Sequence, residues 1–513
     1  MKDLNLSAFK AYDIRTKNEL MDESLKMRLY NAVALYMQDN LHVDSVVVCH
    51  DARLYVSEMA ENLTSVLISA GINVIMNPLP ISTCQFYHIL MKHRNAAGVM
   101  VTASHNPREY VGMKIMEPDL LPLAYGYGTD GGFQRIKEYY IEDRKPRMGA
   151  SKGIIKIVNY IDSYIDYSMK LAGVRSGDLK GEKIMLEFLS GSAGMEVAMA
   201  FQEAGADLVL RHIVPNGFFP SGDPNPIIES SIAPARQAIR DERCSFGFCF
   251  DGDGDRLDLI APDGSQIVPG YNMGILIPEL NKMYESVLNG KIPQYYADVK
   301  AIPAAVSEMS QYGVGVHIIR NGHSFIKAKL RENYNRGYIA AEEESAHYYI
   351  NLPYDLDDIS KGAAAAESTL FYSLLTAKCY HMNPELYKSA LEKQKSLFRK
   401  REWPFHCENH PEIMEDLMDK VENKMESLGA SVIKTMDDGS DLDATLMRFN
   451  LPEFGSAEKL EGNWGQVAQR IARSEDAQVK WEVASNNEKI CNDLNDAIRE
   501  ITDAYVKGNL ASY

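Results

Sequence analysis

A helix that ends at a glycine and turns at once into an apolar strand occurs four times in this chain. The four copies are SAGINVIM at 69–76, EAGADLVL at 203–210, YGVGVHII at 312–319 and SLGASVIK at 427–434. Glycine readily adopts the left-handed backbone that caps a helix, so the chain can turn directly into the next strand. Four such units predict four α/β segments of similar layout, with boundaries near residues 150, 262 and 378.

The first 150 residues show alternating strand and helix patterns. Apolar runs predict strands at 46–49, 74–76 and 98–102, and helical periodicity predicts helices at 55–70 and 83–92. Alternation of this kind indicates parallel strands joined by crossover helices, which is an α/β domain. Much further along, the charged stretch 380–410 predicts a helix and a linker into the last unit.

The charge balance excludes one large class of function. The 513 residues include 54 lysines and arginines and 71 aspartates and glutamates, which gives a net charge of −17. Proteins that bind nucleic acids grip phosphates with clustered lysines and arginines, so this balance argues against such a role. An anionic substrate would need a local island of positive charge.

Cysteine usage and hydropathy predict a cytoplasmic protein. The seven cysteines are scattered and form no CxxC pair, so neither a zinc site nor a disulfide framework is indicated. The opening MKDLNLSAFKAYDIR lacks the apolar core of a signal peptide. No apolar run approaches the roughly 20 residues that a membrane span requires.

Three aspartates separated by single glycines form the strongest local motif, DGDGDR. An apolar strand leads into it, and the glycines let the backbone curl so that Asp251, Asp253 and Asp255 converge. Adjacent carboxylates repel one another, and an all-oxygen ligand set suits Mg²⁺. An acidic hairpin turn is the alternative without a function. An EF-hand is excluded by Arg256 and Pro262, and a haloacid-dehalogenase-type phosphatase is disfavoured by Asp255.

The second motif, TASHNP, begins at Thr102, where a predicted strand ends. In α/β sheets this carboxyl edge of the strands is where ligands bind. Ser104 is therefore either a capping hydroxyl or a nucleophile that carries phosphate. Lys114 follows ten residues later and would place a cation near the same loop.

Together the two motifs resemble those of the α-D-phosphohexomutases, and most closely the phosphomannomutase/phosphoglucomutase branch. FKAYDIR at 9–15 is similar to the opening of that branch, TASHNP to its phosphoserine loop and DGDGDR to its metal loop. Three further segments match in the same order: ADVKAIPAAV at 297–306, NGHSFIK at 321–327 and EESAH at 343–347. The resemblance covers about residues 5 to 375.

This resemblance implies a four-domain α/β architecture. Three related mixed-sheet domains and a C-terminal α+β domain would surround a central cleft. The domains would be residues 1–150 with the phosphoserine loop, 151–262 with the metal loop, 263–378 with the sugar-binding loop, and 379–513 with a linker and an atypical phosphate-binding loop.

The same resemblance implies a phosphohexose mutase that interconverts hexose 1-phosphate and hexose 6-phosphate of mannose, glucose or both. Ser104 would carry the phosphoryl group, and Asp251, Asp253 and Asp255 would hold Mg²⁺ together with the Ser104 phosphate. Transfer would pass through a hexose 1,6-bisphosphate, which would also act as activator. Such transfer depends above all on charge neutralisation and in-line positioning.

Positive charge at the reacting group would come from Arg15, Lys114 and Arg256. The proton of the attacking sugar hydroxyl would be accepted by Lys114 or by a histidine of the third domain. The two candidate histidines there, counted with the catalytic residues, are His323 and His347.

Substrate binding would fall to the third domain. By the resemblance, Glu343 and Ser345 would bind the sugar hydroxyls, and Lys300 would line the substrate side with His323 and His347. Taken alone, Lys300 would be a solvated charge and Glu343 part of an acidic surface run, so these roles depend on the ordered set of motifs.

The fourth domain departs from the family's pattern. The expected phosphate clamp is Arg-x-Ser-(Gly or Asn)-Thr-x-Pro, and the corresponding loop here reads IARSEDA. Most donors are missing, and Glu475 and Asp476 would repel a phosphate unless a cation intervenes. Arg473 and Ser474 are the expected substrate-binding residues. Four residues could form a rearranged clamp: Arg470, Arg473, Ser474 and Lys480.

Two other functions stay open. A sugar-bisphosphate synthase or phosphatase would use the same serine and Mg²⁺, and a non-catalytic phosphosugar-binding protein would account for the altered clamp. Intact Ser104, Lys114 and the three aspartates argue against the latter. The expected partner is a small-molecule phosphosugar, with neither nucleic acid nor membrane, and the preferred hexose and the oligomeric state stay open.

Overall fold

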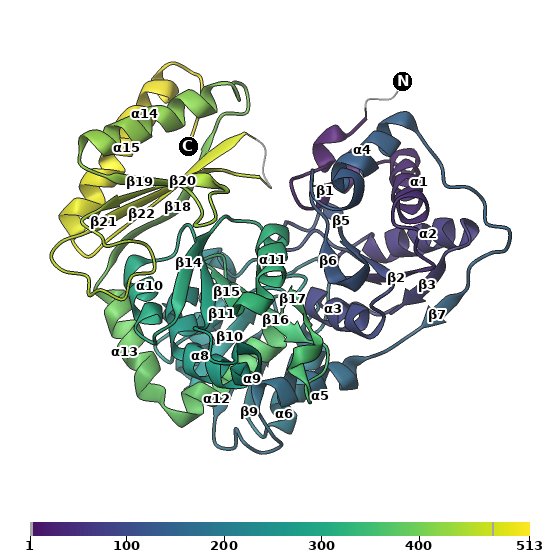
Figure 1. The fold of residues 1–513 in the computed structure, drawn as a ribbon, viewed down its shortest axis with the longest axis horizontal. Helices are drawn as coiled ribbons and strands as arrows, with labels where there is room; N and C mark the ends of the chain where they lie inside the picture. The colour runs from purple at the N-terminus through teal and green to yellow at the C-terminus, as the bar shows by residue number, and fades with distance from the viewer. Residues whose placement is uncertain (1–3, 474–476) are drawn as a thin grey trace. The chain divides into compact units, whose positions relative to one another are not determined.

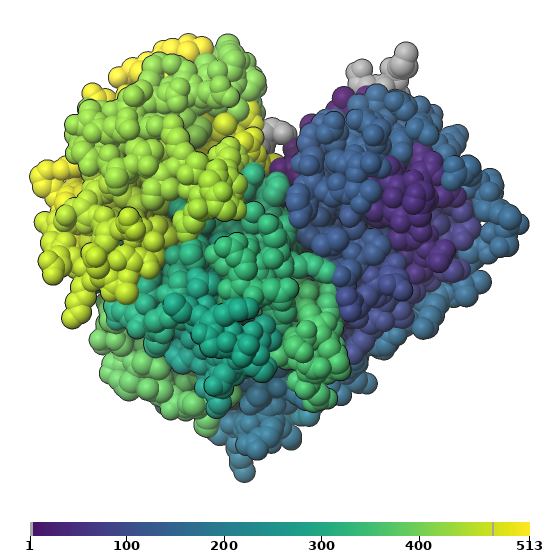
Figure 2. Space-filling view, in the orientation of Figure 1, coloured from purple at the N-terminus to yellow at the C-terminus, as the bar shows by residue number. Residues whose placement is uncertain are grey.

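The computed structural model describes residues 4–473 and 477–513. Contacts divide the chain into two compact units. The first comprises Met1–Gln266, His323–Tyr334 and Ser345–Met382, and the second comprises Ile267–Gly322, Asn335–Glu344 and Asn383–Tyr513. Figure 1 draws the elements of both units, and Figure 2 shows the atoms on the same face.

A seven-stranded sheet organises the N-terminal part of the first unit. Its elements are β1 (Ile14–Lys17), α1 (Glu23–Asp39), β2 (Ser45–His50), α2 (Val56–Ser69), β3 (Asn73–Met76), α3 (Thr83–Lys92), β4 (Ala97–Val101), β5 (Tyr110–Glu117), β6 (Leu121–Pro122), α4 (Phe133–Glu142) and β7 (Ile155–Ile157). The strand order is β1-β5-β4-β2-β3-β7, with β6 beside β5. Strands β4, β2, β3 and β7 are parallel, so the loops after β2 and β4 leave at the same edge.

A five-stranded sheet follows in the same unit. Its elements are α5 (Ile161–Ala172), β8 (Lys183–Glu187), α6 (Gly194–Glu203), β9 (Asp207–Arg211), α7 (Glu229–Glu242), β10 (Phe246–Phe250), β11 (Leu257–Ile260) and β12 (Gln266–Ile267). The strand order is β12-β11-β10-β8-β9. Strand β10 is parallel to β8 and antiparallel to β11, so a tight loop at its carboxyl end reverses the chain.

Four later elements complete the first unit. They are α11 (His323–Glu332), β16 (His347–Pro353), β17 (Ala363–Glu367) and α12 (Thr369–Met382). Strands β16 and β17 pair antiparallel, and Asn351 of β16 donates from Nδ2 to the carbonyl of Leu330 on α11 at 3.0 Å. The helix is thereby fixed against the hairpin.

The second unit combines a short parallel sheet with an antiparallel one. Its elements are α8 (Pro269–Met283), α9 (Glu285–Leu288), β13 (Gln294–Asp298), α10 (Pro303–Ser310), β14 (Gly315–Ile319), β15 (Tyr338–Glu343), α13 (Pro384–Lys395), β18 (Phe398–His406), α14 (Ile413–Ser427), β19 (Ser431–Thr435), β20 (Asp441–Phe449), β21 (Gly465–Ile471), β22 (Gln478–Ser485) and α15 (Glu488–Lys507). Strand β13 lies parallel between β14 and β15. The antiparallel sheet has the order β18-β22-β21-β20-β19.

Buried apolar residues hold these layers together. In the first sheet the β-branched runs of β2 and β4 pack with the apolar faces of α1 and α2 in one continuous core. In the antiparallel sheet of the second unit, residues such as Val467 and Trp481 pack against Leu417 of α14 and Ile498 of α15. Burial of such side chains stabilises the fold by about 1.5–3 kcal/mol each.

The predicted helix–glycine–strand turns are confirmed. All four glycines have positive φ: Gly71 at 84°, Gly205 at 86°, Gly313 at 69° and Gly429 at 98°. Each follows a helix and precedes a strand, at α2–β3, α6–β9, α10–β14 and α14–β19. The predicted fold class, mixed α/β sheets in several domains, is confirmed. The boundaries near 150, 262 and 378 stay a prediction.

One part of the predicted organisation is wrong. The stretch 380–410 contains the expected helix α13, but residues 398–406 form strand β18 instead of a linker. The edge position of β18 explains the difference, because charged side chains are common on a strand that borders solvent. Among the described residues no helix is long and apolar enough to cross a membrane.

Candidate active site

The loop after β4 places Ser104 at the carboxyl edge of the first sheet. Ser104 is buried and has a φ of 54°, a left-handed conformation that is uncommon for a residue with a Cβ atom. Its N–H donates to Thr102 Oγ1 at 2.8 Å, and its Oγ lies 3.1 Å from Nδ1 of His105. The serine hydroxyl is therefore held by its own loop at the end of a buried strand.

The loop between β10 and β11 brings Asp251, Asp253 and Asp255 together. One oxygen of each carboxylate lies within 4.8 Å of the other two, and all three residues are buried. Asp251 Oδ1 accepts hydrogen bonds from the N–H groups of Asp255 and Arg256 at 3.0 and 3.2 Å. Gly254, at a φ of 71°, allows the tight turn. The convergence expected from the alternating aspartates is confirmed.

The donor set of these aspartates fits a divalent cation. Each of the three aspartates has one buried oxygen without a hydrogen-bond partner among the described residues: Asp251 Oδ2, Asp253 Oδ1 and Asp255 Oδ1. Burial and the two neighbouring carboxylates raise the pKa of Asp251 well above its usual value. Buried carboxylate oxygens that lack donors are unfavourable unless a cation lies between them. These three residues could therefore hold a metal ion.

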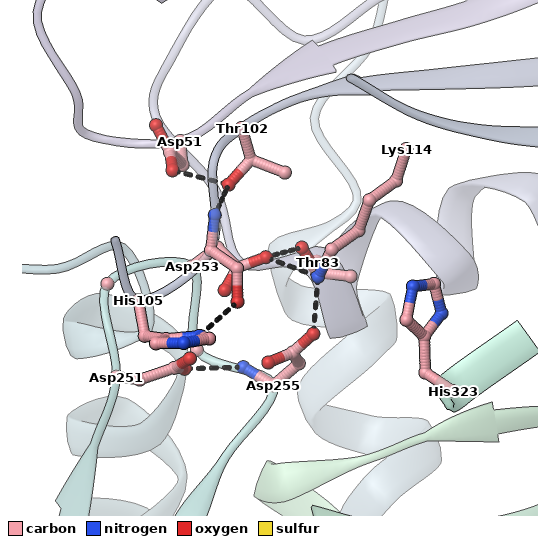
Figure 3. Close-up of polar contacts among 12 residues, drawn as sticks. Asp51, Thr83, Thr102, His105, Lys114, Asp251, Asp253, Asp255 and His323 are labelled. Carbon is pink, nitrogen blue, oxygen red and sulfur yellow. Dashed lines mark hydrogen bonds and ion pairs between the residues drawn. The ribbon is translucent and has the colours of Figure 1, made fainter. Parts of the chain in front are cut away.

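Lys114 of β5 connects the first sheet to this acidic loop. Its Nζ donates to Asp253 Oδ2 at 2.7 Å and to Asp255 Oδ2 at 2.5 Å (Figure 3). Burial opposes the ammonium charge, but the two aspartates raise the pKa of Lys114 above its usual value, so the side chain stays charged. The loops also touch through their backbones, because a Cβ atom on Gly252 would lie 2.9 Å from the carbonyl oxygen of Ser104.

Two arginines add positive charge at the same loops. Arg15 of β1 donates from Nη1 to Asn106 Oδ1 at 2.6 Å, and it also contacts Asp13. Arg256 lies 3.7 Å from Asp251 Oδ2 through Nε and 3.4 Å from Nε2 of His105 through Nη2. The structure thus brings together the three cations predicted for the site.

Both predicted histidines belong to the first unit. His347 Nε2 lies 3.4 Å from Asp255 Oδ1, and its Nδ1 lies 2.8 Å from Ser345 Oγ. The ring of His323 packs edge-on against Tyr12, with centroids 5.0 Å apart, and Figure 3 shows it next to Lys114. Burial and the charges of nearby lysines hold the pKa of His323 well below its usual value. Its imidazole is therefore neutral.

Lys300 and Glu343 belong to the second unit. The N–H of Lys300 donates to Asp298 Oδ1 at 2.7 Å, and Asn321 Nδ2 donates to Asp298 Oδ2 at 2.8 Å and to Glu343 Oε1 at 3.1 Å. Asn321 therefore links the ends of β13 and β15, and sequence reasoning missed it together with Asp298. Burial raises the pKa of Asp298 to about 6.

Two candidates of the atypical loop, Arg470 and Arg473, form ion pairs with different carboxylates, and Lys480 lies opposite Arg470 in the pairing of β21 and β22. Arg473 forms a two-point ion pair with Asp443, to which Arg320 also donates at 2.9 Å. Arg470 instead forms a two-point pair with Glu402, at 2.7 and 2.9 Å. Ser474 lies outside the described residues, as do Glu475 and Asp476.

Comparison with known proteins identifies the family. Residues 6–124 match the model of phosphoglucomutase/phosphomannomutase, alpha/beta/alpha domain I, and residues 160–264 match that of domain II. These two stretches of the chain are therefore similar to domains I and II of the phosphoglucomutase/phosphomannomutase family. The first match contains the Ser104 loop and the second contains the three aspartates, so the family resemblance is confirmed at both motifs.

Relatives and solved structures agree with this assignment. The phosphomannomutase of Escherichia coli strain K12 is 29% identical over 353 residues, which cover 67% of this chain and 73% of that protein. A phosphoglucomutase/phosphomannomutase family protein from Burkholderia thailandensis has a TM-score of 0.77 at 21% identity, covering 100% of both chains. A mutase from Aspergillus fumigatus, solved with glucose 1,6-bisphosphate, has a TM-score of 0.52 at 11% identity and covers 97% of this chain and 95% of that one.

Two further residues of the candidate site were missed by sequence reasoning. Asp51 and Arg53 follow β2, the strand beside β4, so their loop shares an edge with the Ser104 loop. Asp51 Oδ2 accepts from Thr102 Oγ1 at 2.6 Å, and Arg53 Nη1 donates to the carbonyl of Pro107 at 2.8 Å. A charged pair directly after a buried strand is a signal that could have identified them.

Thr83 was also missed by sequence reasoning. It begins α3, donates from Oγ1 to Asp253 Oδ2 at 2.7 Å, and donates from its backbone N–H to the carbonyl of Asp253 at 2.8 Å. The two residues are 170 positions apart, and no local pattern in the sequence marks the contact. Thr83 and Lys114 together occupy Oδ2 of Asp253, which leaves Oδ1 of that carboxylate toward the other aspartates.

Proposed function

We propose that this phosphohexose mutase interconverts the 1-phosphate and 6-phosphate of mannose, glucose or both, through a phosphorylated Ser104. The observation that carries the proposal is one buried serine at a strand end, set against three convergent carboxylates and the cations Arg15, Lys114 and Arg256. Relatives named phosphomannomutase support a mutase over a bisphosphate synthase, a phosphatase or a non-catalytic binder.

The proposed reaction consists of two phosphoryl transfers. A sugar hydroxyl attacks the phosphorus on Ser104, the bond from phosphorus to Oγ breaks, and a hexose 1,6-bisphosphate forms. The bisphosphate then returns its other phosphoryl group to Ser104 Oγ and leaves as the isomer. Each transfer moves one proton from the attacking hydroxyl and needs stabilisation of the charge on the phosphoryl oxygens.

His323 suits the proton transfer better than Lys114. The neutral imidazole of His323 has no hydrogen-bond partner on Nε2 among the described residues, so this atom can accept a proton. Lys114 is held charged between two aspartates and acts instead as a fixed cation beside the phosphoryl group. This division assigns one role to each of two residues that the sequence left as alternatives.

Asp251, Asp253 and Asp255 would hold Mg²⁺. When bound, Mg²⁺ would neutralise negative charge on the transferring phosphoryl group. The Aspergillus fumigatus mutase that was solved with glucose 1,6-bisphosphate supports hexose 1,6-bisphosphate as intermediate and activator here. Small phosphosugars would be the ligands of this site.

Substrate contacts are proposed for both units. Glu343 and Ser345 would bind sugar hydroxyls, and Lys300, His323 and His347 would line the substrate side. Arg473 and Ser474 stay the predicted phosphate contacts of the last domain, and a cytoplasmic location also stays a prediction. The buried amide–carboxylate contacts of Asn321 support the proposed role of Glu343, because they fix its orientation.

Replacement of the serine tests the proposal. We expect Ser104→Ala to lower the conversion of mannose 1-phosphate or glucose 1-phosphate to the 6-phosphate by about a thousandfold or more, because no phosphoenzyme forms. The control is Ser65→Ala, an exposed serine on α2 of the same unit. Phosphorus NMR with Mg²⁺ and hexose 1,6-bisphosphate follows all products. Full activity of Ser104→Ala would exclude the mechanism, and faster release of inorganic phosphate than of isomer would exclude mutase as the main activity.

A further inference from the structure

The stretch from residue 144 to 157 is strongly basic within an acidic chain. It contains five lysines and arginines and no aspartate or glutamate, whereas the whole chain carries a net charge of −17. The five are Arg144, Lys145, Arg147, Lys152 and Lys156, and all are exposed. Arg147 pairs with Asp39 at 2.6 Å, so the remaining cations give this surface a net positive charge.

The basic stretch ends in β7, the outermost strand of the seven-stranded sheet (Figure 1). The carbonyl of Ile154 accepts from the N–H of Val74, and the N–H of Val158 donates to the carbonyl of Met76. Alternate residues of a parallel strand bond to the same neighbour, so the backbone groups of Ile155 and Ile157 face away from β3. The outer edge of β7 is therefore oriented to pair with a further strand.

Large apolar side chains are exposed along the same edge. The exposed fraction is 68% for Ile154, 47% for Ile155 and 60% for Ile157, and Met148 just before the strand reaches 75%. Lysines on an edge strand commonly prevent aggregation, but three exposed isoleucines would work against that protection. Apolar side chains beside outward-facing backbone groups are instead typical of a surface that binds an extended peptide.

A concave surface with basic residues lies at the end of α3. A pocket of about 370 Å³ is lined by Ser45 and by residues 91–96, which include Lys92, His93 and Arg94. His93 Nε2 lies 3.1 Å from the hydroxyl of Tyr160, three residues after the end of β7, and burial and then the charge of Lys156 lower the pKa of His93. Arg94 also contacts Asp119 at 2.7 Å. Positive charge therefore continues from β7 into the pocket, and acidic side chains would complement both.

We propose that the outer edge of β7 docks an acidic, extended segment of a partner protein, which adds a strand to the sheet. A second copy of this chain is disfavoured, because pairing two β7 edges would bring like charges together. A lipid or nucleic acid surface supplies anions but no backbone groups to pair with Ile155 and Ile157. An acidic peptide satisfies the charges, the apolar side chains and the backbone at once.

Designed peptides test this docking site. The first is a ten-residue peptide of alternating valine and glutamate, and the two controls carry lysine or serine in place of glutamate. Fluorescence anisotropy with the full chain should show the glutamate peptide binding about thirtyfold more tightly than the lysine peptide, because opposite charges attract at this edge. Hydrogen exchange should slow at the amides of Ile155 and Ile157, which bonds to a new strand would protect.

Variants separate the backbone contribution from the charge contribution. Ile157→Pro removes an outward N–H while leaving the bond from Val158 to β3, and prolines are tolerated at such edge positions. It should weaken binding of the glutamate peptide by about tenfold or more. The double variant Lys152→Glu/Lys156→Glu should weaken binding of this peptide to a similar extent. The control Lys137→Glu on α4 should leave the binding unchanged. None of these residues belongs to the proposed active site, so sugar-phosphate turnover should stay unchanged and reports a folded protein.

Three results would overturn the proposal. The first is that the glutamate peptide does not bind. The second is that Ile157→Pro and the double lysine variant bind it as tightly as the unchanged protein does. The third is that the unchanged protein binds all three peptides equally tightly. Tighter binding to anionic vesicles or to single-stranded RNA, with no exchange protection at β7, would assign the surface to another class of partner. The outcome is independent of the mutase mechanism, since the readout is binding at an edge strand.

Discussion

Arg53 holds the backbone carbonyl of Ser104. The same buried guanidinium donates to the carbonyls of Asn106 and Pro107, and its Nε lies 3.2 Å from Asp51. Because one planar guanidinium donates to three carbonyl groups of the same loop, it restricts the conformations that this loop can adopt. This contact maintains the left-handed backbone of Ser104, which would otherwise relax toward a more common conformation.

We predict that Arg53→Met lowers kcat by about a hundredfold, because a displacement of about 1 Å at a reacting atom has an effect of that size. Steady-state assays with hexose 1-phosphate measure it. Arg28→Met is the matched control, since Arg28 also donates to two backbone carbonyls, but these belong to Tyr140 and Ile141 of α4 and not to the Ser104 loop. Equal losses in both variants would mean that Arg53 only stabilises the fold.

Removal of Lys114 should affect the cation and the reaction in opposite directions. Lys114→Met eliminates a positive charge 2.7 Å from Asp253, so Mg²⁺ should bind about tenfold more tightly. The same variant should lower kcat, because a fixed cation beside the phosphoryl group is lost. Calorimetry measures the Mg²⁺ affinity without turnover. Lys26→Met, which removes a buried lysine paired with Glu23, should change neither quantity, and weaker Mg²⁺ binding by the Lys114 variant would contradict the proposed arrangement.

The buried pair of Lys327 and Glu367 predicts a non-additive effect on stability. Lys327 Nζ lies 3.0 Å from Glu367 Oε2 and donates to Tyr87 at 2.8 Å, and both charged side chains are fully buried. Lys327→Met alone should lower the free energy of unfolding by about 3–5 kcal/mol, since it leaves an unpaired buried carboxylate. The double variant Lys327→Met/Glu367→Gln should regain most of the free energy of unfolding that the single variant loses. Urea unfolding measures the cycle, and additive losses would show that the charges do not interact.

His88 predicts a loss of stability in acid. Burial lowers the pKa of His88 in the folded protein to about 3, whereas in an unfolded chain it is about 6.5. Between these values the unfolded chain binds more protons, so stability falls as the pH drops below about 6.5. From pH 7 to pH 5 the loss from this residue should be about 2 kcal/mol. His88→Leu should reduce the difference between urea unfolding at the two pH values, and an unchanged difference would assign it to other groups.

Short sequence patterns predicted much of the candidate site. The glycine after each helix predicted all four helix–strand turns because a left-handed cap is a property of one residue and its neighbours. The alternating aspartates predicted their own convergence for the same reason, since their spacing and the intervening glycines determine the turn. Strand β18 escaped prediction because it is a charged strand at a sheet edge, and its residues lack the usual alternation of buried and exposed positions.

Long-range contacts account for what the sequence left undecided. Thr102 and Asp51 are 51 positions apart, and Thr83 and Asp253 are 170 apart, so no window of sequence contains either pair. The sequence predicted Lys114 as a cation of the site, but its charge state depends on two aspartates from another sheet. Arg473 was predicted to contact phosphate, yet only the structure shows it bound to Asp443.

By itself the sequence determined the α/β class, the two motif loops and the family, because glycine caps, apolar strands and closely spaced carboxylates act within a few residues. The tertiary structure decided which residues hold Ser104 in place, which lysine stays charged and which histidine stays neutral. Those properties depend on burial, and on charges and hydrogen bonds between segments that are distant in the chain. Contacts between distant segments produce no periodic pattern in the sequence.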